Sequence, residues 1–145
     1  MDYLSLLPHA PPMRLVEEVV SVEPGRQAVC RRVTRADDFY FQGHFPDVAV
    51  VPAVVLIELI AQAGGLAVGV PLPGAPPLPR ALRVAAVDGF RFPSGCGVGV
   101  TLEATVTVVG RMGSLFKIEG TVTASGAVVA RGAVTLADVG PSGAR

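Results

Sequence analysis

A short apolar segment with one acidic residue in its middle constrains the fold more than any other part of the chain. Residues 54–62 are Val-Val-Leu-Ile-Glu-Leu-Ile-Ala-Gln, so apolar side chains occur on all sides of a helix over this segment. A helix with no solvated face must be covered by other elements. Small residues, among them Gly64, Gly65 and Gly69, continue the segment. They indicate either close approach of another backbone or a ligand, or a frayed helix end.

Strand patterns lie on both sides of this predicted helix. The segments 13–23 and 27–34 are rich in Val and flank a Pro24-Gly25 turn, which predicts a hairpin. Four more strands are predicted after a Pro- and Gly-rich loop at 70–79, over residues 81–92, 99–109, 115–124 and 127–137. In 101–108, Thr and Glu alternate with apolar residues, as in a sheet with one wet and one buried face. The predicted fold class is therefore α+β, with an antiparallel sheet wrapped around one long central helix in a single domain over residues 1–145.

Glu58 is the first candidate catalytic residue, because it lies in the middle of the apolar helix. Moving an unpaired carboxylate out of water has a free-energy cost on the order of several kcal/mol, because the ion loses its hydration. An apolar environment favours the protonated carboxyl group, which can act as a general acid. Gln62 follows one turn later on the same helix face. The alternative is that Glu58 reaches solvent at a helix end or pairs with an Arg.

His44 is the second candidate, in a Gly43-His44-Phe45-Pro46 turn before the helix. Gly43 permits unusual backbone angles and Pro46 fixes φ, so this turn can hold the imidazole in one place. A histidine has the right range of basicity for a general base, and Glu58 could supply the acid. The two residues do not share a helical face. They could meet if the turn folds back over the helix or across a subunit interface, and the sequence leaves both arrangements open.

Other polar residues are interpreted as structural. His9 lies between prolines and has no acidic or Cys neighbour in the sequence, so we expect a structural role for it. Asp37 and Asp38 have no further ligand nearby, which favours a turn or capping role over a metal site. Arg31 and Arg32 are adjacent in a predicted strand and face opposite sides, so at least one should be solvated.

Composition and charge exclude several classes of function. Twelve basic and twelve acidic residues leave no net charge, which argues against a nucleic-acid binder that relies on bulk electrostatics. The amino terminus lacks the pattern of a signal peptide, and the apolar segment is too short to span a bilayer, so we expect no membrane role. Cys30 and Cys96 form neither a disulfide framework nor a metal site. They fit small apolar packing in a reducing cytoplasm.

Residues 41–62 resemble the β-hydroxyacyl-acyl-carrier-protein dehydratases of fatty-acid synthesis, which have the hot-dog fold. The shared features are the Gly-His-Phe-Pro turn, a following helix with a Glu and an Ala-Gln pair, and the same His-to-Glu spacing. Residues 15–17, 23–25 and the Arg-containing turn at 110–113 extend the similarity over most of the chain. The resemblance implies dehydration of a (3R)-3-hydroxyacyl thioester to the trans-2-enoyl thioester, with His44 as base and Glu58 as acid. It implies no metal or organic cofactor.

The resemblance also implies partners and substrate contacts. The substrate would be carried by acyl carrier protein or coenzyme A, and a homodimer or larger homo-oligomer would join His44 of one subunit to Glu58 of the other. His9 belongs to a Leu-Pro-His segment that is not part of the family's catalytic pair. The backbone N–H of Ala53 would bind the thioester carbonyl, and Gly43 and Gln62 would help to position the substrate. Four aromatic side chains are predicted to line the acyl pocket, namely Phe41, Phe45, Phe90 and Phe92, although the aromatic cluster at 39–41 could instead pack in the core.

Three positions depart from the family pattern, with Ala53 for Gly, Asp47 for Gly and Val51 for Met. This version resembles divergent dehydratase-like proteins of secondary-metabolite lipid pathways, such as aryl polyene clusters. Two other functions stay open. A hot-dog thioesterase would activate water with a helix carboxylate and would not need the His44 turn, and a non-catalytic acyl-binding protein would keep only the pocket. Basic residues that could dock an acidic carrier, or be ordinary solvated surface, are Arg80, Arg91, Arg111 and Lys117.

Overall fold

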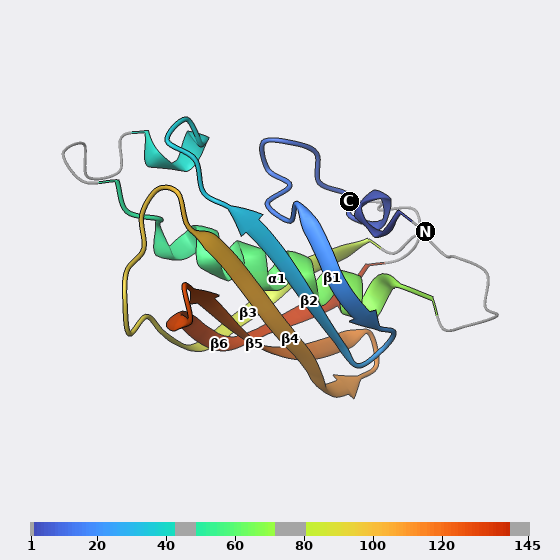
Figure 1. Ribbon diagram of the computed structural model, residues 1–145. Coiled ribbons are helices and arrows are strands. Elements are labelled where there is room, and N and C mark those ends of the chain that lie inside the picture. Colours follow the sequence, from blue (N-terminus) through green and yellow to red (C-terminus); the bar gives the residue numbers. More distant parts are fainter. Residues whose placement is uncertain (1, 43–48, 72–80, 140–145) are drawn as a thin grey trace.

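A computed structural model describes residues 2–42, 49–71 and 81–139, and in it six antiparallel strands form one sheet that curls around a single long helix (Figure 1). The strand order across the sheet is β1-β2-β4-β5-β6-β3. The predicted α+β arrangement is confirmed. In chain order the elements are η1 (Tyr3–Leu6), β1 (Glu18–Glu23), β2 (Gln27–Val33), η2 (Phe39–Phe41), α1 (Ala53–Gly69), β3 (Leu82–Arg91), β4 (Thr101–Met112), β5 (Leu115–Ala124) and β6 (Ala127–Asp138).

The sheet covers α1 on one side only. Leu59, Ile60 and Leu66 are completely buried between the helix and the sheet. In contrast, Val54 is 70% exposed and Glu58 is only half-buried. The prediction that the helix has no solvated face is therefore wrong for the single chain. Within the described part of the chain, the sheet does not cover the strip of α1 that contains Val54 and Glu58, which is called the uncovered strip below.

Small residues let the helix and the sheet approach closely. A Cβ atom added to Gly64 would lie 3.0 Å from Cγ2 of Ile118 on β5, and one added to Gly120 would lie 2.5 Å from Cγ2 of Ile60. Neither position has room for a side chain unless the neighbouring β-branched residue moves. Of the two explanations for the small residues of α1, close approach of another backbone element therefore holds at Gly64. The helix runs to Gly69 and stops before Pro71, because a proline disfavours helical angles at the preceding residue.

The first strand begins at Glu18, five residues later than predicted. Leu15 and Val16 are both buried although they are adjacent, so they do not follow the alternation of a strand. Their backbone N–H groups donate to Oε1 of Gln62, at 2.8 and 3.4 Å, instead of to a neighbouring strand. The segment before β1 is therefore attached to the helix. The predicted turn at Pro24-Gly25 is present, and the N–H of Gly25 donates to the carbonyl of Ala67 at 2.8 Å.

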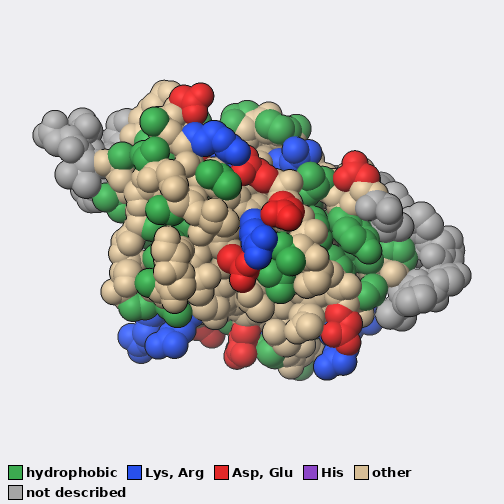
Figure 2. Space-filling view, in the orientation of Figure 1, with side chains coloured by type: hydrophobic (Ala, Val, Ile, Leu, Met, Phe, Trp, Pro, Cys, Tyr) green, Lys and Arg blue, Asp and Glu red, His purple; other side chains and the backbone are tan. Residues whose placement is uncertain are grey.

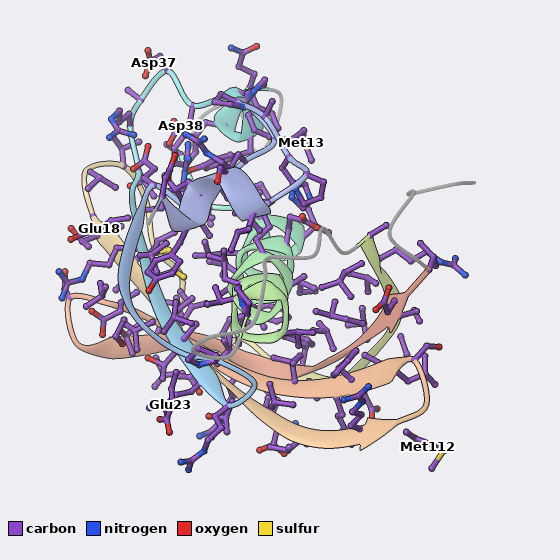
Figure 3. The ribbon with its side chains drawn as sticks, turned by 90° about the vertical axis from the view of Figure 1, so that its right-hand side faces the viewer. Met13, Glu18, Glu23, Asp37, Asp38 and Met112 are labelled. Carbon is purple, nitrogen blue, oxygen red and sulfur yellow. The ribbon has the colours of Figure 1, made fainter. Side chains whose placement is uncertain are left out.

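The two faces of the sheet differ as the alternation predicted. On β4, Leu102, Ala104 and Val106 are completely buried, whereas Thr105 and Thr107 are exposed on the opposite face. Viewed along the helix, the sheet curls around α1, and Met112 projects from the end of β4 (Figure 3). On the outer face formed by β1, β2 and β4, basic and acidic side chains are interspersed (Figure 2). This face therefore carries no extended patch of one charge.

A buried arginine connects β2 with the segment that follows it. Arg32 lies 2.9 Å from Oδ1 of Asp38 and donates to the hydroxyl of Tyr40 and to the carbonyl of Leu15, both at 3.1 Å. The Tyr40 hydroxyl in turn donates to Asp38 at 2.7 Å. Arg31 faces the other side, where it is partly exposed and pairs with Glu103, as the alternation of the strand predicts.

Asp38 has the structural role that the sequence indicates. Its Oδ2 accepts the backbone N–H of Arg35 at 2.8 Å and so closes the turn before η2. Among the described residues, no group of three or more His, Cys, Asp or Glu side chains is arranged to hold a metal ion. Burial raises the pKa of Cys30 to about 12, which keeps it a neutral thiol that packs as a small apolar side chain. Of the helices in the described part of the chain, none is long and apolar enough to cross a membrane.

Candidate active site

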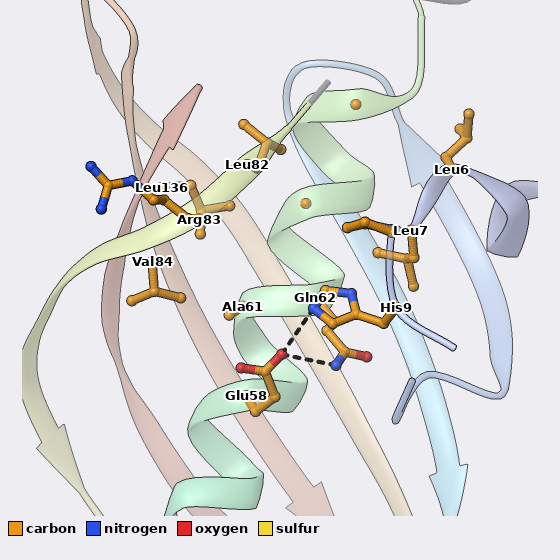
Figure 4. Close-up of a pocket in the computed structure, with 13 residues that line it drawn as sticks. Leu6, Leu7, His9, Glu58, Ala61, Gln62, Leu82, Arg83, Val84 and Leu136 are labelled. Atoms are coloured by element: carbon orange, nitrogen blue, oxygen red, sulfur yellow. Dashed lines mark hydrogen bonds and ion pairs between the residues drawn. The ribbon is translucent and has the colours of Figure 1, made fainter. Parts of the chain in front are cut away.

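A pocket of about 350 Å³ lies beside the uncovered strip of α1 (Figure 4). Its walls come from four places: the segment from Leu6 to His9, the α1 face from Glu58 to Gly69, the start of β3, and Leu136 on β6. Aliphatic side chains form most of the lining, including Leu6, Leu82 and Val84. An apolar pocket with few polar groups is typical of a small-molecule site. The pocket therefore suits the hydrocarbon part of a ligand. Its polar residues are His9, Glu58 and Gln62 on one wall, and Arg83 on β3.

Glu58 supplies the acidic group of this wall. Its side chain is 30% exposed, so it is not enclosed in the core as the apolar sequence around it suggested. Oε2 accepts a hydrogen bond from Nε2 of Gln62 at 2.9 Å and lies 3.3 Å from Nε2 of His9. The second carboxylate oxygen points away from both of these residues (Figure 4). One oxygen is thus held by neighbours, and the other makes no hydrogen bond to the described residues.

Gln62 holds Glu58 and the segment before β1 together. Its side chain is 1% exposed. Oε1 accepts from the N–H groups of Leu15 and Val16, and Nε2 donates to the carbonyl of Met13 at 2.7 Å as well as to Glu58. A primary amide has two donor hydrogens and two acceptor lone pairs, and these four contacts use all of them. Gln62 therefore orients Glu58 and has no donor left for a substrate carbonyl.

The surroundings of His9 differ from those that the sequence indicated. We expected a structural role because no acidic residue neighbours it in the sequence, but the fold places its imidazole against Glu58. The argument from sequence neighbours is therefore wrong. Glu58 lies on a distant helix, and the only local signal was a histidine held between prolines. The imidazole lines the same pocket as the carboxylate.

Ala53 lies at the start of α1 and is exposed. Pro52 precedes it as the N-cap and provides no side-chain hydrogen bond to the first turn. The carbonyl of Pro52 accepts from Val55 at 3.0 Å, which is one turn into the helix. The first N–H groups of a helix have no acceptor within the helix, and their dipoles favour negative charge. The N–H of Ala53 is therefore one of these first donors, although Ala53 is not among the residues that line the pocket.

The remaining predicted site residues are not part of this pocket or lie outside the described residues. His44, Gly43 and Phe45 belong to the segment 43–48, which the structure does not describe. Phe41 is buried in the core, with its ring centre 4.9 Å from that of Tyr40. The other two aromatic residues, Phe90 and Phe92, stack at 5.9 Å near the far end of β3. Within the described chain, the pocket beside Glu58 is therefore aliphatic and not aromatic.

The sequence matches a family model for the FabA-like domain over residues 7–133. Among curated proteins, it is 36% identical over 126 residues to a 3-hydroxyacyl-(acyl-carrier-protein) dehydratase FabZ of Anaeromyxobacter sp. (strain Fw109-5), covering 86% of this chain and 80% of that one. It is 32% identical over 138 residues to the FabZ of Herpetosiphon aurantiacus, covering 95% and 96% of the two chains.

Solved structures with the same fold include enzymes of more than one kind. The dehydratase heterocomplex ApeI:P from Xenorhabdus doucetiae contains a chain that matches with a TM-score of 0.74 at 18% identity, over 98% of this chain and 93% of that one. A hypothetical thioesterase with coenzyme A from Streptococcus pneumoniae matches with a TM-score of 0.64 at 12% identity, over 86% of both chains. At these identities the structures establish the fold alone. The family model and the sequence relatives show that the chain belongs to the FabA-like domain family, and the solved structures agree with its hot-dog fold.

Proposed function

We propose that the protein removes water from a (3R)-3-hydroxyacyl thioester to give the trans-2-enoyl thioester. The observation that supports this proposal is the carboxyl group of Glu58 on the wall of an apolar pocket, with one oxygen held by Gln62 and the other without a hydrogen bond to the described part of the chain. In the reaction, His44 takes the proton from the carbon next to the thioester carbonyl. The bond from C3 to the hydroxyl oxygen breaks, and Glu58 gives its proton to that oxygen, which leaves as water.

The thioester carbonyl gains negative charge as its neighbouring C–H bond breaks. The N–H at Ala53 is the proposed donor to this oxygen, since a helix start offers both free N–H groups and a favourable dipole. An alanine keeps the donor that a glycine would provide. Each of these contributions comes from protein groups, so the proposed reaction uses no metal or organic cofactor.

The substrate is proposed to be an acyl chain on acyl carrier protein, with coenzyme A as the alternative carrier. The aliphatic pocket suits the acyl chain, and the named function of the relatives is action on carrier-bound substrates. Three of the basic residues predicted to dock an acidic carrier are exposed, namely Arg91, Arg111 and Lys117. Arg80 lies outside the described residues. The free cysteines fit the proposal that the protein acts in the reducing cytoplasm.

The proposed working form is a homodimer. β3 is an edge strand, and eight of its ten residues are exposed. Such an edge presents unpaired backbone groups to another strand. Exposed apolar side chains lie on it and on the uncovered strip of α1, among them Val54, Val84 and Val87. A second copy paired along β3 would cover both surfaces, and the proposed site would then combine His44 of one subunit with Glu58 of the other.

Placing a charge on β3 is expected to separate this dimer. Val87→Asp puts a carboxylate in the middle of the exposed edge, where it would be buried or face its own copy across a two-fold axis. We expect the mass in solution, measured by light scattering after size exclusion, to fall from two chains to one. The matched control is Val109→Asp, at a residue of β4 with a similar exposure of 47% against 50% for Val87. A Val87→Asp protein that remains dimeric would contradict the interface.

The experiment that tests the proposed reaction follows two products in one tube. The protein is incubated with 3-hydroxyacyl thioesters of several lengths on coenzyme A and on carrier protein. Ultraviolet absorbance detects the conjugated enoyl thioester, and a thiol reagent detects free carrier. Enoyl formation without thiol release is the expected result. Thiol release alone would favour a thioesterase, for which the carboxylate of Glu58 and the thioesterase-like fold are the supporting observations. If neither product forms, acyl binding becomes the favoured function.

A further inference from the structure

We propose that His9 is a positioning residue for the reaction, because it contacts Glu58 and fixes which carboxyl oxygen carries the reacting proton. This inference rests on the proposed dehydratase function. The direct observation is the 3.3 Å separation between Nε2 of His9 and Oε2 of Glu58 in the lining of the pocket. Figure 4 shows the imidazole and the Gln62 amide approaching the same oxygen from different sides.

The geometry makes Oε2 the acceptor oxygen. It already accepts from Nε2 of Gln62 at 2.9 Å. Because a second nitrogen faces the same atom, the arrangement is satisfied when Nε2 of His9 carries a hydrogen and acts as a second donor. A carboxyl oxygen that faces two donors is a poor place for a proton. In the proposed reaction the hydrogen that Glu58 donates is therefore the one on Oε1, which points away from both nitrogens.

The other imidazole nitrogen agrees with this tautomer. Nδ1 of His9 is buried and has no hydrogen-bond partner among the described residues. A neutral imidazole carries one hydrogen only, and an unpaired N–H in a buried place is costly. With the hydrogen on Nε2, Nδ1 is left as a bare acceptor. The one N–H group of the ring is then used on Glu58.

The segment that carries His9 is held in place by the same network. Gln62 binds the backbone of Met13, Leu15 and Val16, all through its side-chain amide. Arg32 adds a hydrogen bond to the carbonyl of Leu15 at 3.1 Å. The chain that follows His9 is therefore anchored to the helix and to β2 by buried contacts. This attachment is what a positioning residue requires, since a displacement of about 1 Å can lower a rate about 100-fold.

Two substitutions separate positioning from a general effect on structure. His9→Ala removes the contact, and kcat for enoyl formation should fall about 100-fold with little change in KM. His9→Gln keeps an N–H donor near the place of Nε2, and kcat should recover to within about tenfold of the wild type. Circular dichroism and thermal unfolding check that both variants fold. A His9→Ala enzyme within about twofold of the wild type, or a His9→Gln enzyme no better than His9→Ala, would overturn the proposal.

A second measurement tests the contact without any turnover. The chain has two histidines, so the imidazole ¹⁵N signals of His9 are assigned by comparing wild type with His44→Ala. Glu58→Gln should shift the Nε2 signal of His9, whereas Glu119→Gln, at an exposed position on β5, should leave it unchanged. Unchanged His9 signals in Glu58→Gln would refute the pairing. If wild type shows no dehydration but the signals shift, the contact is real and it is the proposed reaction that fails.

Discussion

Glu58→Gln is expected to lower kcat for dehydration by a factor of about 10²–10⁴, the usual contribution of a general acid. The amide has nearly the shape of the carboxyl group, and its oxygen can still accept the hydrogen bond from Gln62. It has no acidic hydrogen to give to the departing hydroxyl group. The loss should therefore appear in kcat and leave KM nearly unchanged, as measured by enoyl absorbance over a range of substrate concentrations.

Glu119→Gln is the matched control for this experiment. It makes the same chemical change at an exposed position on the outer face of β5, away from the pocket. We expect this variant to keep the wild-type rate. His44→Ala belongs in the same series and should also abolish enoyl formation. If Glu58→Gln retains a tenth of the wild-type rate or more, the carboxyl group is not the acid, because general acid catalysis contributes more than about tenfold.

Arg32→Leu is expected to lower the free energy of unfolding by about 3–5 kcal/mol, the usual effect of removing one partner from a buried ion pair. The guanidinium and the carboxylate of Asp38 lie 2.9 Å apart, and their side chains are 8% and 9% exposed. Without Arg32 the buried carboxylate loses its ion-pair partner, and the carbonyl of Leu15 loses its donor. Denaturant unfolding followed by circular dichroism measures the change.

Arg31→Leu is the control for this substitution, because it removes the same charge from the neighbouring position on the exposed face. Its pairs with Glu18 and Glu103 are solvated, so we expect a loss of less than about 1 kcal/mol. A similar loss in both variants would show that burial of Arg32 is not what matters.

The stability that Asp38 contributes depends on pH. Burial by itself would raise its pKa, but the hydrogen bonds from Tyr40 and Arg35 and the charge of Arg32 outweigh burial and hold the pKa below its usual range. A lowered carboxyl pKa adds stability above the unfolded-state value, near 4, and this stability is lost as the pH falls through the folded-state value. Wild type should therefore lose more stability than Arg32→Leu as the solution is acidified below about pH 4.

The sequence was sufficient to predict most of the fold, because the fold follows from patterns that are local. The alternation along β4 and the apolar segment of α1 each identify their element without knowledge of its neighbours. The start of β1 was misplaced for the opposite reason. Leu15 and Val16 are as apolar as strand residues, but their N–H groups bind a side chain from α1. A contact across the fold overrode the local preference there.

In the candidate site, too, features set by local sequence could be predicted and contacts between elements could not. Glu58 was identifiable, since a charged residue in an apolar helix is conspicuous in any sequence. The contact between His9 and Glu58 was not, because it depends on how the segment before β1 lies against the helix. Gln62 was recognised as a neighbour of Glu58, but its other contacts come from residues far away in the sequence. Spacing along one element predicts a face, while contacts between elements require the fold.

The four contacts of the Gln62 amide couple the order of the amino-terminal segment to the geometry of the acid. The backbone hydrogens of Leu15 and Val16 can exchange with deuterium from solvent only when the amide oxygen of Gln62 releases them. The same motion weakens the hydrogen bond from Gln62 to Glu58. The deuterium exchange rates of these two amides therefore measure how often the hydrogen bond between Gln62 and Glu58 opens. The frequency of these openings would determine how long Glu58 keeps the geometry that the proposed reaction needs.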